Sequence, residues 1–408
     1  MGKSTFFTGQ PVMAQLLQLI PASLVAQTAK RFQSNHYYKK FKAYDHLVSM
    51  LFCGFNQCTS LRELITGLQA NSNRLKHLGL NYTPRRTTLA DANKCRSSEF
   101  FEGIFHGLVK HHFGGSPDSL KIKAVRDRLF VIDSTTISLF CEVMKAAGYY
   151  RNGKKKGGIK AHTLMRVKDQ VPSFVHLSES AMNDRVFLPM INLPANSIVA
   201  MDKGYVNYHV MKRWTENNIT WVSRLNEAAN FELIETRSVT DYHQKHGITF
   251  DQLIILGNKK TTSRRPIQIA RLVGFYDMNK KRSFTFITNN LKLSALTVAK
   301  IYKQRWSIES LFRRVKQNFQ FHNFLGDNEN AIKIQVWCTL IADLLVAIVK
   351  ETVERLRKSK WSFANIAGLI RLHLTTYIDL FKFLHDPEKA IITYSKEIQS
   401  PQLLIFDS

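Results

Sequence analysis

The sequence is poor in cysteine, and the cysteines it has are not arranged in pairs. Its 408 residues include five cysteines, an odd number, scattered between positions 53 and 338. No two of them form a C-x-x-C pair, and this argues against a zinc site of that kind and against a disulfide framework. We therefore expect reduced, mostly buried thiols in a cytoplasmic protein.

The sequence also lacks an apolar run long enough to cross a bilayer. The longest run, residues 334–349, includes Gln335 and Asp343 and is shorter than the roughly 20 residues that a membrane helix needs. The first twenty residues show no sustained apolar core followed by a small-residue cleavage site, so no signal peptide is expected. The run suits a buried helix, and we expect no membrane partner.

Acidic residues are too few to balance the basic ones. The chain has 31 Asp and Glu against 58 Lys and Arg, a formal net charge of +27. Such an excess repels itself in a compact fold and indicates a polyanionic partner. Nucleic acid is the expected partner, and an anionic membrane surface is the weaker alternative. A glycosidase, whose sugar substrate is neutral, would have no use for this charge.

The order of the elements predicts an α/β protein of several parts. We expect a helical domain over residues 1–75, a helical connector over 76–125 and an α/β domain over 126–350. Inside the last, residues 226–290 lose the helical pattern and are interpreted as a β-rich insertion. Residues 351–408 are predicted to be a C-terminal helical region.

Two segments combine basic residues with a composition that suits nucleic acid. Residues 29–46 interleave lysines, among them Lys39 and Lys40, with tyrosines and phenylalanines. The alternative is a solvated basic face with buried rings. Residues 145–160 are rich in glycine and lysine and are predicted to be a mobile, DNA-facing loop, or else a solvated loop without a partner.

The stretch YKQRWSIESLFRRVK, residues 302–316, gathers polar side chains on one side of a predicted helix. At 100° per residue, Tyr302, Arg305, Glu309 and Lys316 fall within an arc of about 60°. An apolar stripe beside them would pack the helix on a core. The alternative is a solvated face on which Glu309 pairs with Arg313 at i,i+4.

Three carboxylates on different elements could form a metal site. Asp133 and Asp202 each follow a short apolar run, RLFVID and NSIVAMD, which predicts strands with the aspartates at their carboxyl ends. Glu309 would face them from the helix. Such hard oxygen ligands suit Mg²⁺, and two ions can support phosphoryl transfer. A buried structural aspartate at a strand end is the alternative for each.

The stretch YKQRWSIESLFRRVK resembles the Y-x₂-R-x₃-E-x₆-K signature of bacterial DDE transposases of the insertion-sequence-four family. LFVIDSTT is similar to that family's first-aspartate block and VAMDKGY to its second. The resemblance covers residues 129–349. It implies an RNase H-like catalytic domain with a β-rich insertion between the second aspartate and the glutamate, preceded by a helical DNA-binding domain and followed by C-terminal helices.

The resemblance also implies a function. A transposase would bind the terminal inverted repeats of an insertion sequence, cut with two Mg²⁺ ions (Mn²⁺ able to substitute), and transfer the strand through a hairpin intermediate. Its partners would be transposon-end and target DNA, and its active complex a homodimer in the bacterial cytoplasm, associated with the nucleoid. The alternatives are an RNase H-like nuclease that does not join strands and a non-catalytic DNA-binding regulator.

The resemblance assigns roles to particular residues. Asp133, Asp202 and Glu309 would be the catalytic metal ligands. His162 is a further candidate that could touch the scissile phosphate, with a satisfied strand histidine as the alternative. Asp184 could be a fourth acidic site residue or, more simply, part of a helix N-cap. The expected DNA-binding residues are Tyr302, Arg305, Lys316, Arg313, Lys154, Lys155, Lys156, Lys39 and Lys40.

Overall fold

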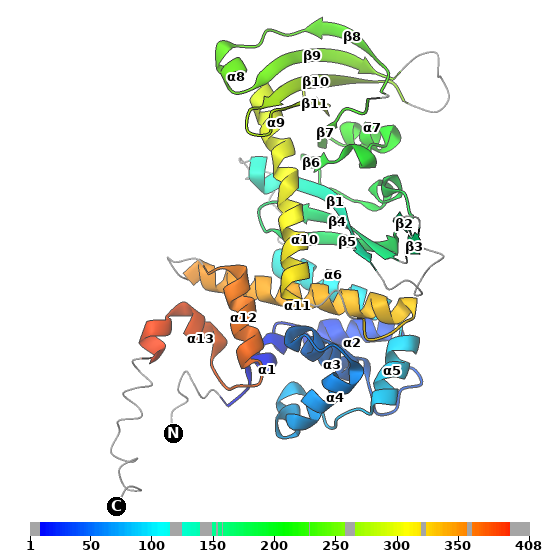
Figure 1. The fold of residues 1–408 in the computed structure, drawn as a ribbon, viewed down its shortest axis with the longest axis vertical. Helices are drawn as coiled ribbons and strands as arrows, with labels where there is room; N and C mark the ends of the chain where they lie inside the picture. Colours follow the sequence, from blue (N-terminus) through cyan, green and yellow to red (C-terminus); the bar gives the residue numbers. More distant parts are fainter. Residues whose placement is uncertain are drawn as a thin grey trace, which may run out of the picture. The chain divides into compact units, whose positions relative to one another are not determined.

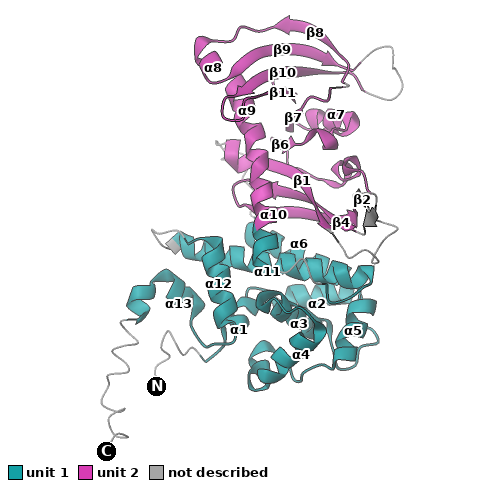
Figure 2. Cartoon of the chain, viewed as in Figure 1, with its two compact units in different colours: residues 1–114, 314–408 teal, residues 115–313 magenta. Residues whose placement is uncertain are grey.

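A computed structural model describes residues 9–114, 125–138, 149–151, 154–156, 158–227, 229–257, 266–319, 324–356 and 361–391. The chain forms two compact units (Figure 2). Unit 1 combines residues 1–114 with residues 314–408, and unit 2 spans 115–313. The boundary between the units falls inside one helix, α10 (Ser307–Asn318).

Unit 2 is built on a nine-stranded sheet with the strand order β5-β4-β1-β6-β7-β11-β10-β9-β8 (Figure 1). The strands are β1 (Leu129–Ser138), β4 (Gly158–Arg166), β5 (Val171–Glu179), β6 (Ile198–Met201), β7 (Thr220–Arg224), β8 (Phe231–Thr236), β9 (Ile248–Leu256), β10 (Gln268–Asp277) and β11 (Arg282–Thr288).

The centre of the sheet is parallel, and its margins are antiparallel. β1, β6 and β7 run parallel, whereas β4 and β5 pair antiparallel beside β1, and β11 pairs antiparallel with β7. All four residues of β6, IVAM, are buried. A continuous apolar strand is expected where both faces of a parallel sheet are covered. The mixed α/β architecture predicted from the sequence is therefore confirmed.

The strands of residues 226–290 extend this same sheet. β11 joins β7 through the pairs Phe286–Arg224 and Thr288–Val222, and β10, β9 and β8 follow outward. One short helix, α8 (Asp241–Lys245), lies within the segment, because Thr240 caps it by accepting a hydrogen bond from the His243 backbone N–H. The absence of helix predicted for this segment is therefore wrong at α8.

Short helices connect the strands and cover the sheet. They are η2 (Val125–Arg128), η4 (Asp184–Val186), η5 (Leu188–Met190), η6 (Lys203–Tyr205), α7 (Tyr208–Glu216), α9 (Ala295–Lys303) and η8 (Gln304–Trp306). Trp214 of α7 and Trp221 of β7 are almost wholly buried in the core of the sheet. The Trp221 indole N–H donates to the Met211 carbonyl at 3.1 Å, so its one polar group is satisfied.

The helix predicted across residues 302–316 is not a single α-helix. α9 begins after its cap Ser294, whose hydroxyl accepts from the Thr297 N–H. A 3₁₀ turn, η8, then separates α9 from α10 at residues 304–306. The Ser307 hydroxyl donates to the Gln304 carbonyl at 2.6 Å and so satisfies a backbone group at the junction. The tighter turn changes which residues share a face with Glu309.

Unit 1 is all-helical within its described residues. Its helices are α1 (Val12–Leu17), α2 (Ala22–Arg31), α3 (Ala43–Asn56), α4 (Leu61–Ala70), η1 (Ser72–Leu78), α5 (Arg86–Cys95), α6 (Glu99–Phe113), α11 (Glu329–Leu356), α12 (Phe363–His373) and α13 (Leu380–His385). Ser60 caps α4, accepting from the Glu63 N–H.

Helix α11 forms the centre of unit 1. It is the one described helix long and apolar enough for a membrane span, and it is buried against α3, α5, α6, α12 and α13. Its Asp343 is 2% exposed and receives two hydrogen bonds from Arg314, at 3.0 and 2.6 Å. The prediction of a buried helix for residues 334–349 is confirmed. Figures 1 and 2 show both ends of the chain contributing helices to this unit.

The segments expected to face DNA have more structure than was predicted. In residues 145–160 the described part forms a small hairpin, β2 (Tyr149–Arg151) and β3 (Lys154–Lys156), followed by the start of β4. The expectation of an unstructured loop is wrong for these residues, and the rest of the predicted loop lies outside the described residues. In residues 29–46, Arg96 donates to the Phe41 carbonyl and its guanidinium stacks on Tyr38.

Candidate functional site

Asp133 and Asp202 lie side by side at the end of a parallel strand pair. β1 and β6 are in register up to Ile132 and Met201, and an aspartate is the next residue along the chain in both cases. β6 ends there, as the sequence predicted. β1 does not: it continues to Ser138, because its other edge stays paired with β4. Asp133 therefore lies within a strand and Asp202 just after one.

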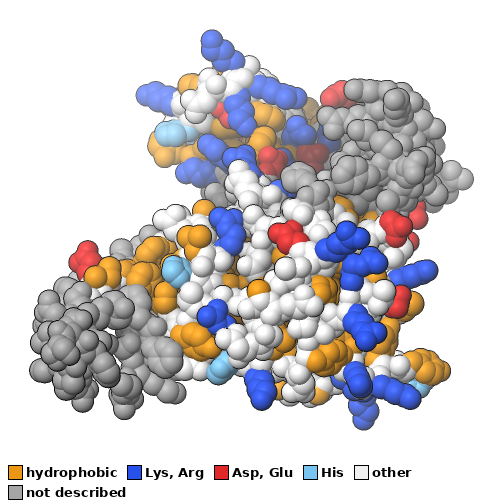
Figure 3. Space-filling model, turned by 60° about the horizontal axis from the view of Figure 1, so that its bottom comes forward, with side chains coloured by type: hydrophobic (Ala, Val, Ile, Leu, Met, Phe, Trp, Pro, Cys, Tyr) orange, Lys and Arg blue, Asp and Glu red, His pale blue; other side chains and the backbone are white. Residues whose placement is uncertain are grey.

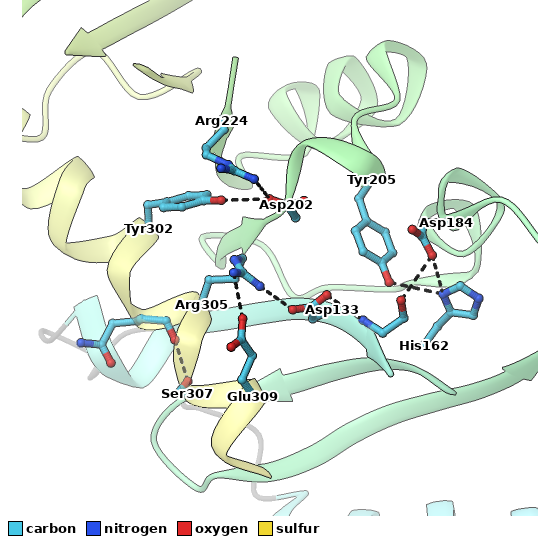
Figure 4. A network of polar contacts seen from close by, with 12 residues as sticks. Asp133, His162, Asp184, Asp202, Tyr205, Arg224, Tyr302, Arg305, Ser307 and Glu309 are labelled. Atoms are coloured by element: carbon cyan, nitrogen blue, oxygen red, sulfur yellow. Dashed lines mark hydrogen bonds and ion pairs between the residues drawn. The ribbon is translucent and has the colours of Figure 1, made fainter. Parts of the chain in front are cut away.

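Arg305 joins Asp133 to Glu309. Its guanidinium donates through Nη1 to Asp133 Oδ2 and through Nη2 to Glu309 Oε1, the second at 3.1 Å (Figure 4). Turn η8, which carries Arg305, contacts β1 and β6, so the side chain is 8% exposed. One buried cation thus brings together carboxylates from β1 and α10.

Asp202 has its own pair of donors. Arg224, the last residue of β7, donates through Nη2 to Asp202 Oδ1 at 2.8 Å, and the Tyr302 hydroxyl donates to the same oxygen at 3.1 Å (Figure 4). Arg224 was not predicted as a site residue. Its place at the carboxyl end of a strand parallel to β6 is a signal that could have found it.

The two aspartates have opposite pKa shifts. Burial raises the pKa of Asp133 to about 6, with Arg305 opposing and the charges of Asp202 and Glu309 adding to the rise. Burial also raises the pKa of Asp202, but the hydrogen bond and charge of Arg224, with the Tyr302 hydroxyl, outweigh it and leave that pKa lowered. Burial, with the negative charge of Asp202, raises the pKa of Tyr302 to about 12. The pKa of Asp133 thus reflects both of the other carboxylates.

The donor set suits a hard divalent cation. Three carboxylates from three elements influence one another's charge, and such oxygen ligands are those that Mg²⁺ prefers. Within the described residues, however, no group of three or more His, Cys, Asp or Glu side chains is arranged to hold a metal ion. Arg305 lies between two of the carboxylates and offsets their charge, so a metal ion binding there would compete with it.

His162 lies next to this site and is completely buried on β4. Its Nε2 is 2.9 Å from the Ser178 hydroxyl and its Nδ1 is 3.3 Å from the Tyr205 hydroxyl. Burial lowers the pKa of His162 to about 4, so the imidazole is neutral near pH 7. Buried and bonded at both ring nitrogens, it has the character of the satisfied strand histidine given above as the alternative.

Asp184 contacts the residue that follows Asp133, the first of the two aspartates. Its Oδ1 accepts from the Ser134 hydroxyl at 3.3 Å and from Lys160 Nζ at 3.2 Å. The N-cap of η4 is its neighbour Asn183, whose side chain accepts from the Arg185 N–H. The side chain of Asp184 is therefore not the cap, and it faces the segment that carries Asp133 (Figure 4).

The residues expected to bind DNA differ in exposure. Tyr302 and Arg305 are buried and directed at carboxylates, whereas Arg313 and Lys316 on α10 are exposed, as are Lys39 and Lys40. The three lysines of β3 are placed in the hairpin, but their side chains lie outside what the structure describes. On the surface shown in Figure 3, Lys and Arg side chains outnumber Asp and Glu.

Comparison with known proteins identifies the family. Residues 125–345 match the model of the transposase DDE domain, and residues 8–81 match a domain of unknown function. A protein of Sinorhizobium fredii named as a transposase is 28% identical over 65% of this chain and 72% of its own length. One of Geobacillus stearothermophilus, named as a transposase for an insertion sequence element, is 26% identical over 58% of this chain and 60% of its own length.

A third relative, from Synechocystis, is also named for an insertion sequence element and is 23% identical over 64% of this chain and 71% of its own length. Among solved structures, the piggyBac transposase synaptic complex with hairpin DNA shows 9% identity and a TM-score of 0.43, covering 97% of this chain and 85% of that one; a likeness this weak supports no argument about fold. The domain match spans more than half of the 408 residues. The chain therefore belongs to the DDE transposases of bacterial insertion sequences, and it is an enzyme of DNA cleavage and strand transfer.

Proposed function

We propose that Asp133, Asp202 and Glu309 are the catalytic carboxylates of this transposase and hold two Mg²⁺ ions, for which Mn²⁺ can substitute. The observation that carries the proposal is the convergence of β1, the end of β6 and α10 on Arg305 and its neighbours. DDE transposases depend on divalent metal ions in general. Bound there, the ions would activate the attacking oxygen and stabilise the leaving oxygen of a phosphoryl transfer.

The chain's own cations would position the DNA. Arg305 presents a planar fork that suits a phosphate as well as a carboxylate. We infer that Tyr302, Arg305 and Lys316 bind the terminal phosphates of a transposon end. Further backbone contacts are proposed for Arg313, Lys154, Lys155, Lys156, Lys39 and Lys40. These contacts would favour a freed 3′-hydroxyl attacking the opposite strand, so that cleavage proceeds through a hairpin.

The fold supports a finer assignment. We propose that β1, β4, β5, β6 and β7 are the RNase H-like core, since three antiparallel strands are followed by two that run parallel to the first. Residues 226–290 would be the β-rich insertion, and residues 1–75 a helical DNA-binding domain. Membership in the insertion-sequence-four family and a homodimer that bridges two ends belong to the same proposal, as does a nucleoid-associated protein of the bacterial cytoplasm.

The proposal is tested with a labelled duplex that carries a transposon end, taken from the inverted repeats that flank the gene. Asp133→Asn, Asp202→Asn and Glu309→Gln keep side-chain size but remove the charge that would hold a metal ion. Each should abolish nicking in Mg²⁺ while leaving binding in EDTA nearly unchanged. The matched control is Asp127→Asn, which changes a half-buried aspartate of unit 2 that pairs with Lys168.

The outcomes separate the functions. Nicked and hairpin species from the wild type, lost in the three variants and kept in Asp127→Asn, support the transposase mechanism. Nicking without a hairpin or strand transfer indicates a nuclease instead. If Glu309→Gln nicks at the wild-type rate, the catalytic assignment is wrong.

A further inference from the structure

The carboxylate of Asp184 lies between the two segments that bear the aspartates. On one side it accepts from Ser134, the residue directly after Asp133. On the other it approaches the segment after Asp202: a methyl group added to Gly204 would lie 3.5 Å from Asp184 Oδ2. Lys160 holds the carboxylate in place, since its Nζ donates both to Asp184 Oδ1 at 3.2 Å and to the Met182 carbonyl at 3.1 Å.

Behind Asp184, a buried chain of hydrogen bonds links the segment after Asp202 to strands β4 and β5. The Ser178 hydroxyl donates to the Glu179 carbonyl at 3.2 Å, so it accepts from the Nε2–H of His162. In the neutral ring Nδ1 then has a free lone pair, which accepts from the Tyr205 hydroxyl. Tyr205 is 1% exposed, and its backbone N–H donates to the Asp202 carbonyl at 3.0 Å. The position of Asp202 is thereby tied to β4.

The side chains of Asp184 and Lys160 are 28% and 16% exposed, so this ion pair is partly buried, and Asp184 Oδ1 also lies 3.6 Å from His162 Nδ1. The ion pair with Lys160 holds the Asp184 carboxylate where it accepts the hydrogen bond from the Ser134 hydroxyl. Ser134 also places its backbone N–H 2.9 Å from Asp133 Oδ1, so its position bears directly on the orientation of that carboxylate.

We propose that Asp184 is a positioning residue for the catalytic site. Its carboxylate accepts hydrogen bonds from Ser134 and Lys160 and lies next to Gly204. In this position it sets the orientation of Asp133 and the distance between Asp133 and Asp202. The inference rests on the proposed roles of those two aspartates. Groups that orient metal ligands typically change metal affinity or activity by about 10–100-fold when removed. Asp184 need not touch DNA or metal to have that effect.

The test measures Mn²⁺ binding to the full-length protein by electron paramagnetic resonance, without DNA, alongside end nicking and end binding in EDTA. Asp184→Ala removes both the acceptor and the charge, and it should weaken Mn²⁺ binding by about tenfold or more. The nicking rate of Asp184→Ala at saturating end DNA should fall, while its affinity for end DNA in EDTA should change by less than about twofold. Asp184→Asn keeps an acceptor for Ser134 and should lie between the wild type and Asp184→Ala.

The control is Asp127→Ala. Asp127 also belongs to unit 2 and pairs with Lys168 at 3.2 Å, the same distance as in the Asp184 pair, with a similar exposed fraction of 32%. This variant should keep wild-type Mn²⁺ binding. If Asp184→Ala unfolds, Ser134→Ala provides a milder change, since it deletes only the hydroxyl, and it should reproduce the loss of Mn²⁺ affinity.

Each result decides the question. Unchanged Mn²⁺ binding in a folded Asp184→Ala or Ser134→Ala protein, while Asp133→Asn loses it, overturns the positioning role and leaves the catalytic assignment intact. If Asp133→Asn itself binds Mn²⁺ as well as the wild type, the proposed metal site is wrong and the positioning role falls with it. Equal losses of Mn²⁺ affinity in Asp184→Ala and Asp127→Ala would show a general effect of removing a negative charge and would also overturn the positioning role.

Discussion

At the scale of single residues, Arg305 is the central feature of the site. It is buried, it bonds two carboxylates, and among the residues that the structure describes its Nε has no hydrogen-bond partner. A guanidinium with an unsatisfied buried nitrogen gains from any new acceptor. On the proposed function, the same side chain would neutralise the carboxylates before metal binds and would turn to a phosphate when DNA is present.

Replacing Arg305 should separate these two roles. In Arg305→Ala a metal ion no longer competes with the guanidinium, so Mn²⁺ should bind about tenfold more tightly, whereas end-DNA binding in EDTA should weaken by about tenfold or more. Both figures follow from one charge-assisted hydrogen bond, worth about 1.5–3 kcal/mol. The measurements are electron paramagnetic resonance for Mn²⁺ and gel shift for DNA, at pH 8, which is above the pKa of about 6 that Asp133 has in the wild type.

Two further variants keep this experiment specific. Arg305→Lys retains the positive charge but loses the planar guanidinium that can make two parallel hydrogen bonds. The gain in Mn²⁺ affinity and the loss of DNA affinity should therefore both be smaller than in Arg305→Ala. Arg213→Ala removes an exposed arginine of α7 in the same unit and should leave Mn²⁺ binding unchanged. Weaker Mn²⁺ binding by a folded Arg305→Ala protein would show that the guanidinium organises the carboxylates for metal instead of competing with it.

At the scale of elements, the register of β1 against β6 places the aspartates, and the outer strands depend on a close contact. Gly274 of β10 sits at a register shift opposite β9. A methyl group there would come within 2.3 Å of Thr249 Oγ1 and 2.4 Å of the Phe250 ring. Only a residue without a side chain fits this position without moving its neighbours.

Gly274→Ala should accordingly destabilise unit 2 by about 1–3 kcal/mol, the usual cost of forcing extra volume into a packed site. The measurement is the free energy of unfolding in urea, followed by tryptophan fluorescence. Gly368→Ala on α12 is the control, because a methyl group there meets nothing within 4 Å. A Gly274→Ala protein as stable as the wild type would mean that β10 and β9 are packed less closely than described.

At the scale of the whole molecule, the net charge of +27 should dominate DNA affinity. Unit 1 contains residues from both ends of the chain, so deleting the first 114 residues would expose the buried surface of α11. A loss of DNA binding by such a truncated protein could then result from loss of folding instead of loss of DNA recognition. Substitutions at exposed lysines test the charge without that risk.

The logarithm of DNA affinity should fall with the logarithm of salt concentration by about 0.9 per phosphate neutralised, a loss of orders of magnitude between low and physiological salt for several contacts. Lys39→Gln with Lys40→Gln should lower that slope by nearly two. Lys168→Gln is the control, since Lys168 already pairs with Asp127. A salt-insensitive affinity, or an unchanged slope in the double variant, contradicts the prediction.

The sequence by itself determined the α/β class, the strands that lead to Asp133 and Asp202, the β-rich character of residues 226–290, and the family. The apolar run of β6 is a local signal, because a buried strand must be apolar wherever it lies in the chain. The cap residues Ser60 and Ser294 are equally local, since each bonds a backbone group three residues on. The spacing of the Tyr302, Arg305, Glu309 and Lys316 signature needed no tertiary information to be recognised.

Only the tertiary structure decided which groups meet. The partners of Asp202 and Asp184 are Arg224, Lys160 and Ser134, and these come from other strands, so no local period points to them. The continuation of β1 past Asp133 depends on its pairing with β4, and the 3₁₀ turn that aims Arg305 at the carboxylates lies between two helices that the sequence showed as one. The union of both chain ends in unit 1 has the same cause: contacts between distant residues become favourable only when folding buries them together.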